Sequence, residues 1–427
     1  MFCVNLVRQA HAHSVRPTRR SLLGLSRLLV FLVLSIGYVF ASAQQSSSPP
    51  ATVKKTPALE HWDGTGDSPD NPRPLAHDLS SALTPAAIDQ AVQKVGDWQL
   101  ERAQPYFSQD WSFAVLYVGY MSASNSLHEQ RYEDAMLQMG RKFDWKLGPR
   151  LIDPTYRGHG QAVGQTYDTD NQGLAQTYIE LYEIKHRPVM IAATKAQFDQ
   201  LMTVKDRPDA PAWWFCDDLF VAAPSWMELY KATGNKAYLD YMNRQWWITS
   251  KSLYDSRERL YFRDSSYFPK REKNGKKVFW SRGNGWVLAG YARVLDEMPK
   301  DYPSRPRYIK QFKQMASRIA SLQSEDGLWR PGLLDPKAYS LPEVSGSALF
   351  VYGLAWGVDN GILDRKKYLP VVQAGWKGLL SHIYADGRLG SIQPVASAPG
   401  GFQLSSSYVY GVGAFLLAGS QMKTLAK

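Results

Sequence analysis

Two kinds of hydrophobic pattern alternate along the chain from residue 84 onward. In the first kind, apolar residues recur at helical spacing and charged residues occupy the opposite face, which is typical of helices with one buried and one wet side. The clearest examples are residues 130–143, 237–251, 308–322 and 366–383. A similar helix is predicted over 86–104, where Thr84 provides an N-cap and Pro85 the first helical position.

The second kind of segment is apolar or small at nearly every position and begins with a polar or aromatic cluster. A helix without a polar face must be buried by its neighbours. These segments start about 45–65 residues apart, which is the length of a helical hairpin with its loops. Their predicted starts are Trp111, Asp170, Asp217, Arg282, Ser345 and Ser406.

Six buried helices that alternate with amphipathic ones predict a closed double ring, an all-α (α/α)6 barrel over residues 84–427. Glycine and alanine in the buried segments permit the close approach that a small inner ring needs. An Asp-containing turn followed by a short extended piece also recurs, at 255–261, 326–329 and 386–389. An open solenoid is the alternative, but the polar starts of its helices would not converge.

The first 43 residues have the features of a signal peptide, and residues 44–83 those of a flexible linker. A basic stretch precedes the apolar run 28–40, and Ala41-Ser42-Ala43 supplies the small residues of a cleavage site. We therefore expect export to the periplasm or the extracellular space, with no stable membrane association after cleavage. A retained anchor is the alternative. Arg19-Arg20 loosely matches a twin-arginine signal, so the export route stays open.

The amino-acid composition limits the classes of molecule that the protein is expected to bind. The net charge of +11 includes five arginines in the first 27 residues, and no Lys/Arg-dense stripe follows that would track phosphates, so nucleic acid is not expected. A modest positive excess and 14 Trp with 24 Tyr suit an anionic sugar, although a large aromatic core explains the aromatics equally well. The eight histidines show no metal-ligand spacing, so we expect neither a metal nor a cofactor. Oligomeric state stays open.

The starts of the inner helices should gather at one rim, and this is where we expect the chemistry. Asp217 lies in the apolar stretch 212–220, where desolvation raises a carboxyl pKa and makes a general acid. Asp170 supplies a second carboxylate, the usual apparatus for glycosidic bonds. Each aspartate could instead cap its helix, and Asp218 competes with Asp217 for the inward position.

Other rim residues are candidates for substrate binding. In Trp280–Trp286, two glycines allow close approach to a ligand, Arg282 offers a planar fork for a carboxylate, and Trp286 a surface for stacking. A buried ion pair at a glycine-rich helix start is the alternative. The full set of substrate-binding candidates is Trp111, Trp214, Arg263, Arg282, Asn284, Trp286, Ser345 and Tyr408.

Four of these motifs together resemble glycoside hydrolase family 105, the unsaturated rhamnogalacturonyl hydrolases, and the related unsaturated glucuronyl hydrolases of family 88. They are DNQGLAQTYIELY (170–182), WWFCDDLFVAAPSW (213–226), WSRGNGW (280–286) and PEVSGSALFVYGLAWG (342–357). The resemblance extends from Ala86 to the C-terminus. It implies an (α/α)6 barrel that removes a terminal 4,5-unsaturated uronic acid from lyase-generated oligosaccharides.

The resemblance also implies a mechanism and residue roles. Asp217 would protonate the C4=C5 enol ether and help water to add at C5, with Asp170 as its carboxylate partner. Arg282 and Trp286 would hold the unsaturated sugar. The chain departs from the family pattern at Asp170-Asn171-Gln172 and at Arg263, where relatives often carry histidines. These departures leave open which sugar follows the cleaved bond.

Two other functions fit the same barrel. An inverting hydrolase of saturated glycans would need its two carboxylates about 6.5–9.5 Å apart. A non-catalytic carbohydrate-binding protein would use the aromatic rim only for capture, but carboxylates in an apolar setting cost desolvation without helping neutral sugars to bind. A sugar isomerase is a more distant alternative, because it would be expected to use histidine pairs that the sequence lacks.

Overall fold

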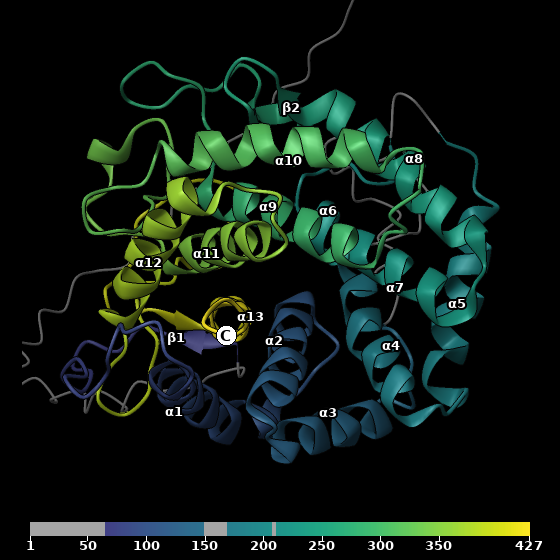
Figure 1. Ribbon diagram of the computed structural model, residues 1–427, viewed down its shortest axis with the longest axis horizontal. Coiled ribbons are helices and arrows are strands. Elements are labelled where there is room, and N and C mark those ends of the chain that lie inside the picture. The colour runs from purple at the N-terminus through teal and green to yellow at the C-terminus, as the bar shows by residue number, and fades with distance from the viewer. Residues whose placement is uncertain (1–64, 149–168, 207–210) are drawn as a thin grey trace, which may run out of the picture. The chain divides into compact units, whose positions relative to one another are not determined.

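The inner helices form a ring that is buried on all sides. The computed structural model describes residues 65–148, 169–206 and 211–427, and within them the chain folds into two concentric layers of helices (Figure 1). The inner layer comprises α2 (Trp111–Leu127), α4 (Gly173–Lys185), α6 (Asp218–Val221) with α7 (Ala223–Thr233), α9 (Ser281–Glu297), α11 (Val344–Asp359) and α13 (Val409–Leu425).

Each inner helix follows an amphipathic helix of the outer layer. The outer helices are α1 (Pro85–Ala103), α3 (Gln130–Lys142), α5 (Val189–Met202), α8 (Lys236–Leu253), α10 (Arg305–Ala320) and α12 (Arg365–Leu380). This alternation, together with the neighbours reported below, confirms the predicted (α/α)6 barrel. The predicted helix limits agree with the structure to within a few residues, and Thr84 caps α1 by accepting a hydrogen bond from the Ala87 amide.

The ring closes where the last inner helix meets the first. α13 packs along α2, and Figure 1 shows the two side by side, with α1 in the outer layer below and to the left of them. Glycines permit this approach, because a Cβ on Gly413 would lie 2.3 Å from the Val115 carbonyl oxygen and one on Gly119 would lie 2.6 Å from that of Gly413. The backbones of the two helices are therefore nearly in contact.

The recurring Asp turns connect outer helices to inner ones. In all three the aspartate accepts a hydrogen bond from the amide two residues later, at Asp255–Arg257 (3.0 Å), Asp326–Leu328 (3.1 Å) and Asp386–Arg388 (3.2 Å). Gly327 and Gly387, with φ of 82° and 103°, adopt the left-handed backbone that the turns require. At the first of these turns, β2 (Tyr254–Asp255) also pairs with β3 (Leu260–Tyr261). These turns fix where each following inner helix begins.

The segment that precedes α1 differs from the sequence prediction over residues 65–83. This part of the predicted linker lies against the barrel: β1 (Gly66–Asp67) pairs with β4 (Ser407–Tyr408), and the Ala76 amide donates to the Ile383 carbonyl. Asp67 also pairs with Arg102 at 3.3 Å and with Arg388. Polar composition suggested a linker, yet backbone pairing and the largely buried carboxylate of Asp67 hold the segment in place.

The predicted signal peptide and the first part of the predicted linker lie outside the described residues. Among the helices that the structure describes, none is long and apolar enough to cross a membrane.

A buried charge cluster joins the C-terminal halves of three inner helices. Arg293 donates at 2.6 Å to Glu180 and at 2.6 Å to Glu228, so two carboxylates share one guanidinium. Burial raises the pKa of Glu228 to about 8; Arg293 opposes this shift, whereas the negative charge of Glu180 and, more weakly, that of Glu297 add to it. One guanidinium cannot fully compensate both carboxylates in a desolvated site.

We predict that Gly413→Ala destabilises the barrel. The added methyl group would overlap the Val115 carbonyl, and backbone cannot move aside as a flexible side chain can. Overpacking of this kind costs about 1–3 kcal/mol. Thermal unfolding of the variant would show a lower Tm, whereas the control Gly401→Ala, whose Cβ meets nothing within 4 Å, would not. Equal Tm values for the two variants would contradict tight closure.

We also predict that Glu228→Gln removes part of the pH dependence of stability. Because the pKa of Glu228 is raised on folding, the folded state binds more protons than the unfolded one between an ordinary glutamate pKa and about 8. Stability must therefore fall as pH rises through this window. At pH 8 the variant should be more stable than the wild type by about 1–2 kcal/mol in urea unfolding, and at pH 5 by less. The exposed control Glu101→Gln should leave the slope unchanged.

Candidate active site

The turn before α6 leaves the side chain of Asp217 partly accessible. Its neighbours are anchored: Cys216 is fully buried and its amide donates to the Arg263 carbonyl at 2.8 Å, while Asp218 is fully buried and accepts from the Phe215 amide at 3.1 Å. Asp217 itself keeps 14% of its side chain exposed. The structure therefore gives the two aspartates different roles, with Asp218 bracing the turn and Asp217 accessible.

The environment of Asp217 favours its protonated form. Burial raises its pKa above the usual range, and the nearby cations Arg263 and Arg282 only partly oppose this. The thiol of Cys216 donates to Oδ1 at 3.2 Å. The start of α9 also lies close, since a Cβ on Gly283 would be 3.6 Å from Oδ1. A carboxyl group whose pKa is raised in this way is better suited to general-acid catalysis than an ordinary aspartate.

Asp170 lies at the start of the neighbouring inner helix. It opens the short helix η2 (Asp170–Gln172) that leads into α4, and it is partly exposed. Gln172 connects this segment to α7, accepting from the Ser225 hydroxyl at 2.7 Å and from the Trp226 indole at 2.8 Å. Burial raises the pKa of Asp218 well above its usual range, and the charges of Asp170 and Asp217 raise it further. Three carboxyl groups thus come together at the predicted site.

Arg263 is the accessible cation beside Asp217. Its Nε lies 3.9 Å from Asp217 Oδ2, and its Nη1 donates to Asp264 at 2.9 Å. The guanidinium packs on the rings of Trp214, at 5.0 Å, and Phe215, at 4.5 Å, and 18% of the side chain stays exposed. Nε is buried and has no hydrogen-bond acceptor among the described residues. This arrangement holds a positive charge where an anionic group could approach Asp217.

An aromatic row forms another part of the rim. Trp111 stacks on Tyr410 with centroids 5.2 Å apart, and Tyr410 stacks on Tyr408 at 5.8 Å. Trp111 and Tyr408 are partly exposed, whereas Tyr410 is buried and donates its hydroxyl to the Gln393 carbonyl at 2.5 Å. Trp111, Trp214, Arg263 and Tyr408 are all partly exposed, and their role in ligand binding stays a prediction.

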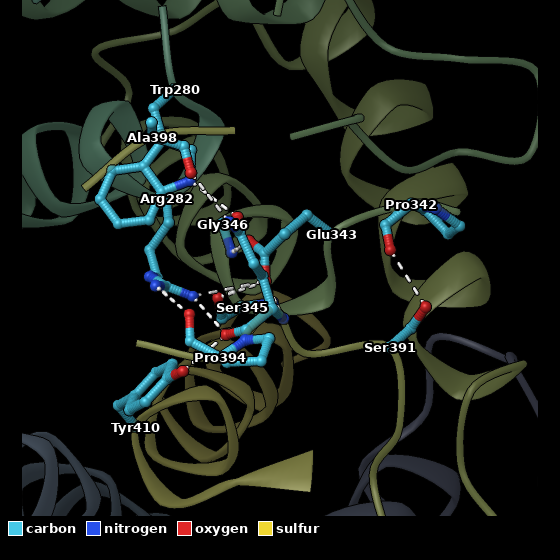
Figure 2. A network of polar contacts seen from close by, with 11 residues as sticks. Trp280, Arg282, Pro342, Glu343, Ser345, Gly346, Ser391, Pro394, Ala398 and Tyr410 are labelled. Atoms are coloured by element: carbon cyan, nitrogen blue, oxygen red, sulfur yellow. Dashed lines mark hydrogen bonds and ion pairs between the residues drawn. The ribbon is translucent and has the colours of Figure 1, made fainter. Parts of the chain in front are cut away.

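Arg282 does not have the role that the sequence suggested. Its side chain is 1% exposed, lies between the rings of Trp280 and Tyr410, and donates to the carbonyls of Gln393 at 2.6 Å and Pro394 at 2.9 Å (Figure 2). It also lies 4.0 Å from Glu343. The expected direct contact between Arg282 and a sugar carboxylate is thus corrected: the guanidinium is engaged in fixing the loop at residues 393–394.

Three more predicted binding residues are buried and act within the scaffold. Asn284 bridges α9 to β3 by accepting from the Tyr261 amide and donating to the Tyr261 carbonyl. Trp286 packs on Phe220 with centroids 5.0 Å apart. Ser345 donates its hydroxyl to Glu343 at 2.6 Å. Inner helices press against one another beyond their first residues, so polar groups there bond to protein.

Sequence reasoning missed the residues that support the rim. Glu343 is fully buried and accepts from the amides of Ser345, Gly346 and Gln393. Gln393 also accepts from the Trp280 indole at 2.9 Å. Glu343 could have been recognised from the sequence as an N-cap, because it lies two residues before Ser345 at the start of an inner helix. The sequence around Gln393 has no comparable feature. In the part of the chain that the structure describes, no cluster of three or more His, Cys, Asp or Glu could hold a metal.

The chain is similar in sequence and in structure to several known proteins. Residues 86–426 match the family described as Glycosyl Hydrolase Family 88. An unsaturated 3S-rhamnoglycuronyl hydrolase of Formosa agariphila is 37% identical over 365 residues, which cover 80% of this chain and 92% of that protein. A protein of the same name from an Alteromonas species is 31% identical over 374 residues, covering 81% and 89%. A solved family 88 glycosyl hydrolase from Bacteroides vulgatus superposes with a TM-score of 0.74, at 31% identity, covering 80% of this chain and 99% of that one.

Proposed function

Since the chain belongs to glycosyl hydrolase family 88, we propose that it removes a terminal 4,5-unsaturated uronic acid from oligosaccharides that polysaccharide lyases release. The observation that supports this most directly is Asp217, a carboxyl group with a raised pKa beside an accessible arginine and an aromatic surface. The arginine can bind the negatively charged group of such a substrate, and the carboxyl group can donate a proton to it during the reaction.

The proposed reaction is hydration of the C4=C5 double bond. Asp217 gives its proton to C4, and water adds its oxygen to C5 while returning a proton to the Asp217 carboxylate. The hemiketal at C5 then opens, and the hemiacetal left at C1 collapses and releases the next sugar with its hydroxyl group. Asp170 serves as the carboxylate partner that orients the water. Water does not attack the anomeric carbon directly. The distance between two carboxylates therefore does not determine a retaining or inverting outcome, as it does in ordinary glycosidases.

Arg263 is proposed to bind the carboxylate of the unsaturated sugar. It replaces Arg282 in this role, because Arg282 is buried and bonded to loop carbonyls whereas Arg263 is accessible and lies beside Asp217. Trp214, on which the Arg263 guanidinium packs, and the row of Trp111 and Tyr408 offer apolar faces for sugar rings. Arg282 instead stabilises the loop at 393–394, and so affects the site indirectly, through the position of that loop.

For the sugar after the cleaved bond, we propose the 3S-rhamnoglycuronyl class that the names of the two relatives give. The finer resemblance to family 105 remains a proposal as well, supported by the motifs at 213–226 and 280–286. Export is proposed from the sequence of residues 1–43, which suits an enzyme acting on fragments of external polysaccharides.

The first test follows the ultraviolet absorbance of the conjugated C=C–COO⁻ group. The purified protein should consume this absorbance with a 3S-rhamnoglycuronyl disaccharide and do so more slowly with unsaturated disaccharides from other polysaccharides. An increase in absorbance on intact polymer would indicate elimination instead of hydration. No change with any unsaturated disaccharide, together with cleavage of a saturated glycan, would overturn the proposed reaction.

Asp217→Asn should abolish this activity without unfolding the protein. General acid–base catalysis contributes about 10²–10⁴-fold, so kcat should fall by at least about 10²-fold. The Tm should hold or rise, because a neutral amide avoids the cost of a buried carboxylate. The exposed Asp301→Asn serves as a matched control and should retain full activity. An active Asp217→Asn protein would remove this residue from the mechanism.

A further inference from the structure

An exposed basic hairpin extends from the rim of the active site. Residues 269–277, with the sequence PKREKNGKK, lie in the connection between β3 and α9 and contain five cationic side chains and one acidic one. The backbones of Arg271 and Lys277 form an antiparallel β-bridge, and Gly275 lies in the turn between them with φ of 81°. Most of these residues are exposed. The positive charge is thus concentrated in one short connection.

The hairpin is held in a defined position. The Asn274 amide donates to Asp335 at 3.0 Å, and its side chain donates to the Leu334 carbonyl at 2.8 Å. Glu272, at the start of the turn, accepts from the Tyr339 hydroxyl at 2.8 Å. The acidic side chain of the hairpin is therefore turned toward the barrel, and the cations stay on the outside.

Much of the positive charge has no acidic partner. Lys277 pairs with Asp255, and Arg271 donates to two backbone carbonyls. Lys270 lies over the ring of Tyr267 at 3.7 Å. Within the described ranges, neither Lys273 nor Lys276 forms an ion pair with a carboxylate. Like charges so close together repel one another, and an anionic partner would relieve that repulsion.

The base of the hairpin belongs to the active site. The connection begins at Arg263, beside Asp217, and ends at Trp280, on which Arg282 packs. Phe268 lies between them, 40% exposed and packed edge-on against Phe262. An exposed aromatic ring next to several cations combines the two contacts that anionic sugars accept, stacking on a C–H face and charge pairing.

We propose that Phe268 and the hairpin form an outer subsite for the anionic part of the oligosaccharide beyond the leaving sugar. Phe268 stacks on a sugar ring, and Lys273 and Lys276 attract sulfate or carboxylate groups further along the chain. This inference rests on the proposed function, since it concerns the same substrate. It means that the enzyme favours longer anionic fragments over disaccharides, and that this preference depends on ionic strength.

The test removes two charges and compares substrate lengths. In Lys273→Gln/Lys276→Gln, kcat/KM for an unsaturated sulfated tetrasaccharide should fall about tenfold at low salt, with little change for the disaccharide. At 0.5 M NaCl the difference between variant and wild type should disappear, because exposed charges are then screened. Phe268→Ala should also lower kcat/KM for the tetrasaccharide, and this effect should persist in salt.

A matched control lies on the outer layer. Lys310 and Lys313 of α10 line a cationic cleft with Arg305, which donates to carbonyls at the far end of α9. Lys310→Gln/Lys313→Gln removes the same charge there and should leave the tetrasaccharide preference intact. An equal loss in this control would indicate a general effect of net charge and would overturn the subsite.

A binding measurement tests the outer subsite independently of the proposed reaction. Calorimetric titration with a saturated sulfated tetrasaccharide, which cannot be turned over by hydration, should show weaker binding to the hairpin variant than to the wild type. Equal affinity and equal kinetics on both lengths would overturn the subsite, even if the disaccharide is hydrated normally. Hairpin-dependent binding without hydration of any unsaturated substrate would overturn the proposed reaction alone.

Discussion

The constraint on which the structure depends is that the inner helices have no polar face. Each of them must be covered on every side, and a closed ring inside an outer shell achieves this with short connections. The contact of Gly413 with the Val115 backbone shows how tightly the ring closes. Closure brings the starts of helices that are far apart in sequence to one rim, and the site exists only because of this convergence.

Close packing also explains the division of labour among the polar residues at the rim. A position one turn into an inner helix is surrounded by neighbouring helices, so Asn284 and Trp286 become structural. Asp217, in the turn directly before α6, and Arg263, in the connection between β3 and α9, instead keep part of their side chains exposed. The same loss of water that makes buried polar groups form hydrogen bonds raises the pKa of Asp217, and thereby prepares it as an acid.

Arg282 illustrates how a binding surface is supported from beneath. Its guanidinium bonds to the carbonyls of residues 393–394 and stacks between two aromatic rings, while Glu343 accepts several amides of the same region. Buried charged groups thus hold the irregular loop at residues 393–394 in place. The solvated charges of the basic hairpin, by contrast, remain available for a ligand.

The sequence by itself determined the layers of the barrel, the limits of most helices and the position of Asp217, because these follow from local periodicity, capping and an apolar neighbourhood. It also named Trp111, Trp214, Arg263 and Tyr408 as binding candidates, and all four are partly exposed in the structure. Only the tertiary structure decided which polar side chains are accessible: Arg282 and Ser345 are as polar as Arg263 in the sequence, but they face partners from residues 343 and 393–394. Residues 65–83 likewise have the composition of a linker, and their attachment depends on pairing with strand β4 more than 300 residues later, which no local pattern records.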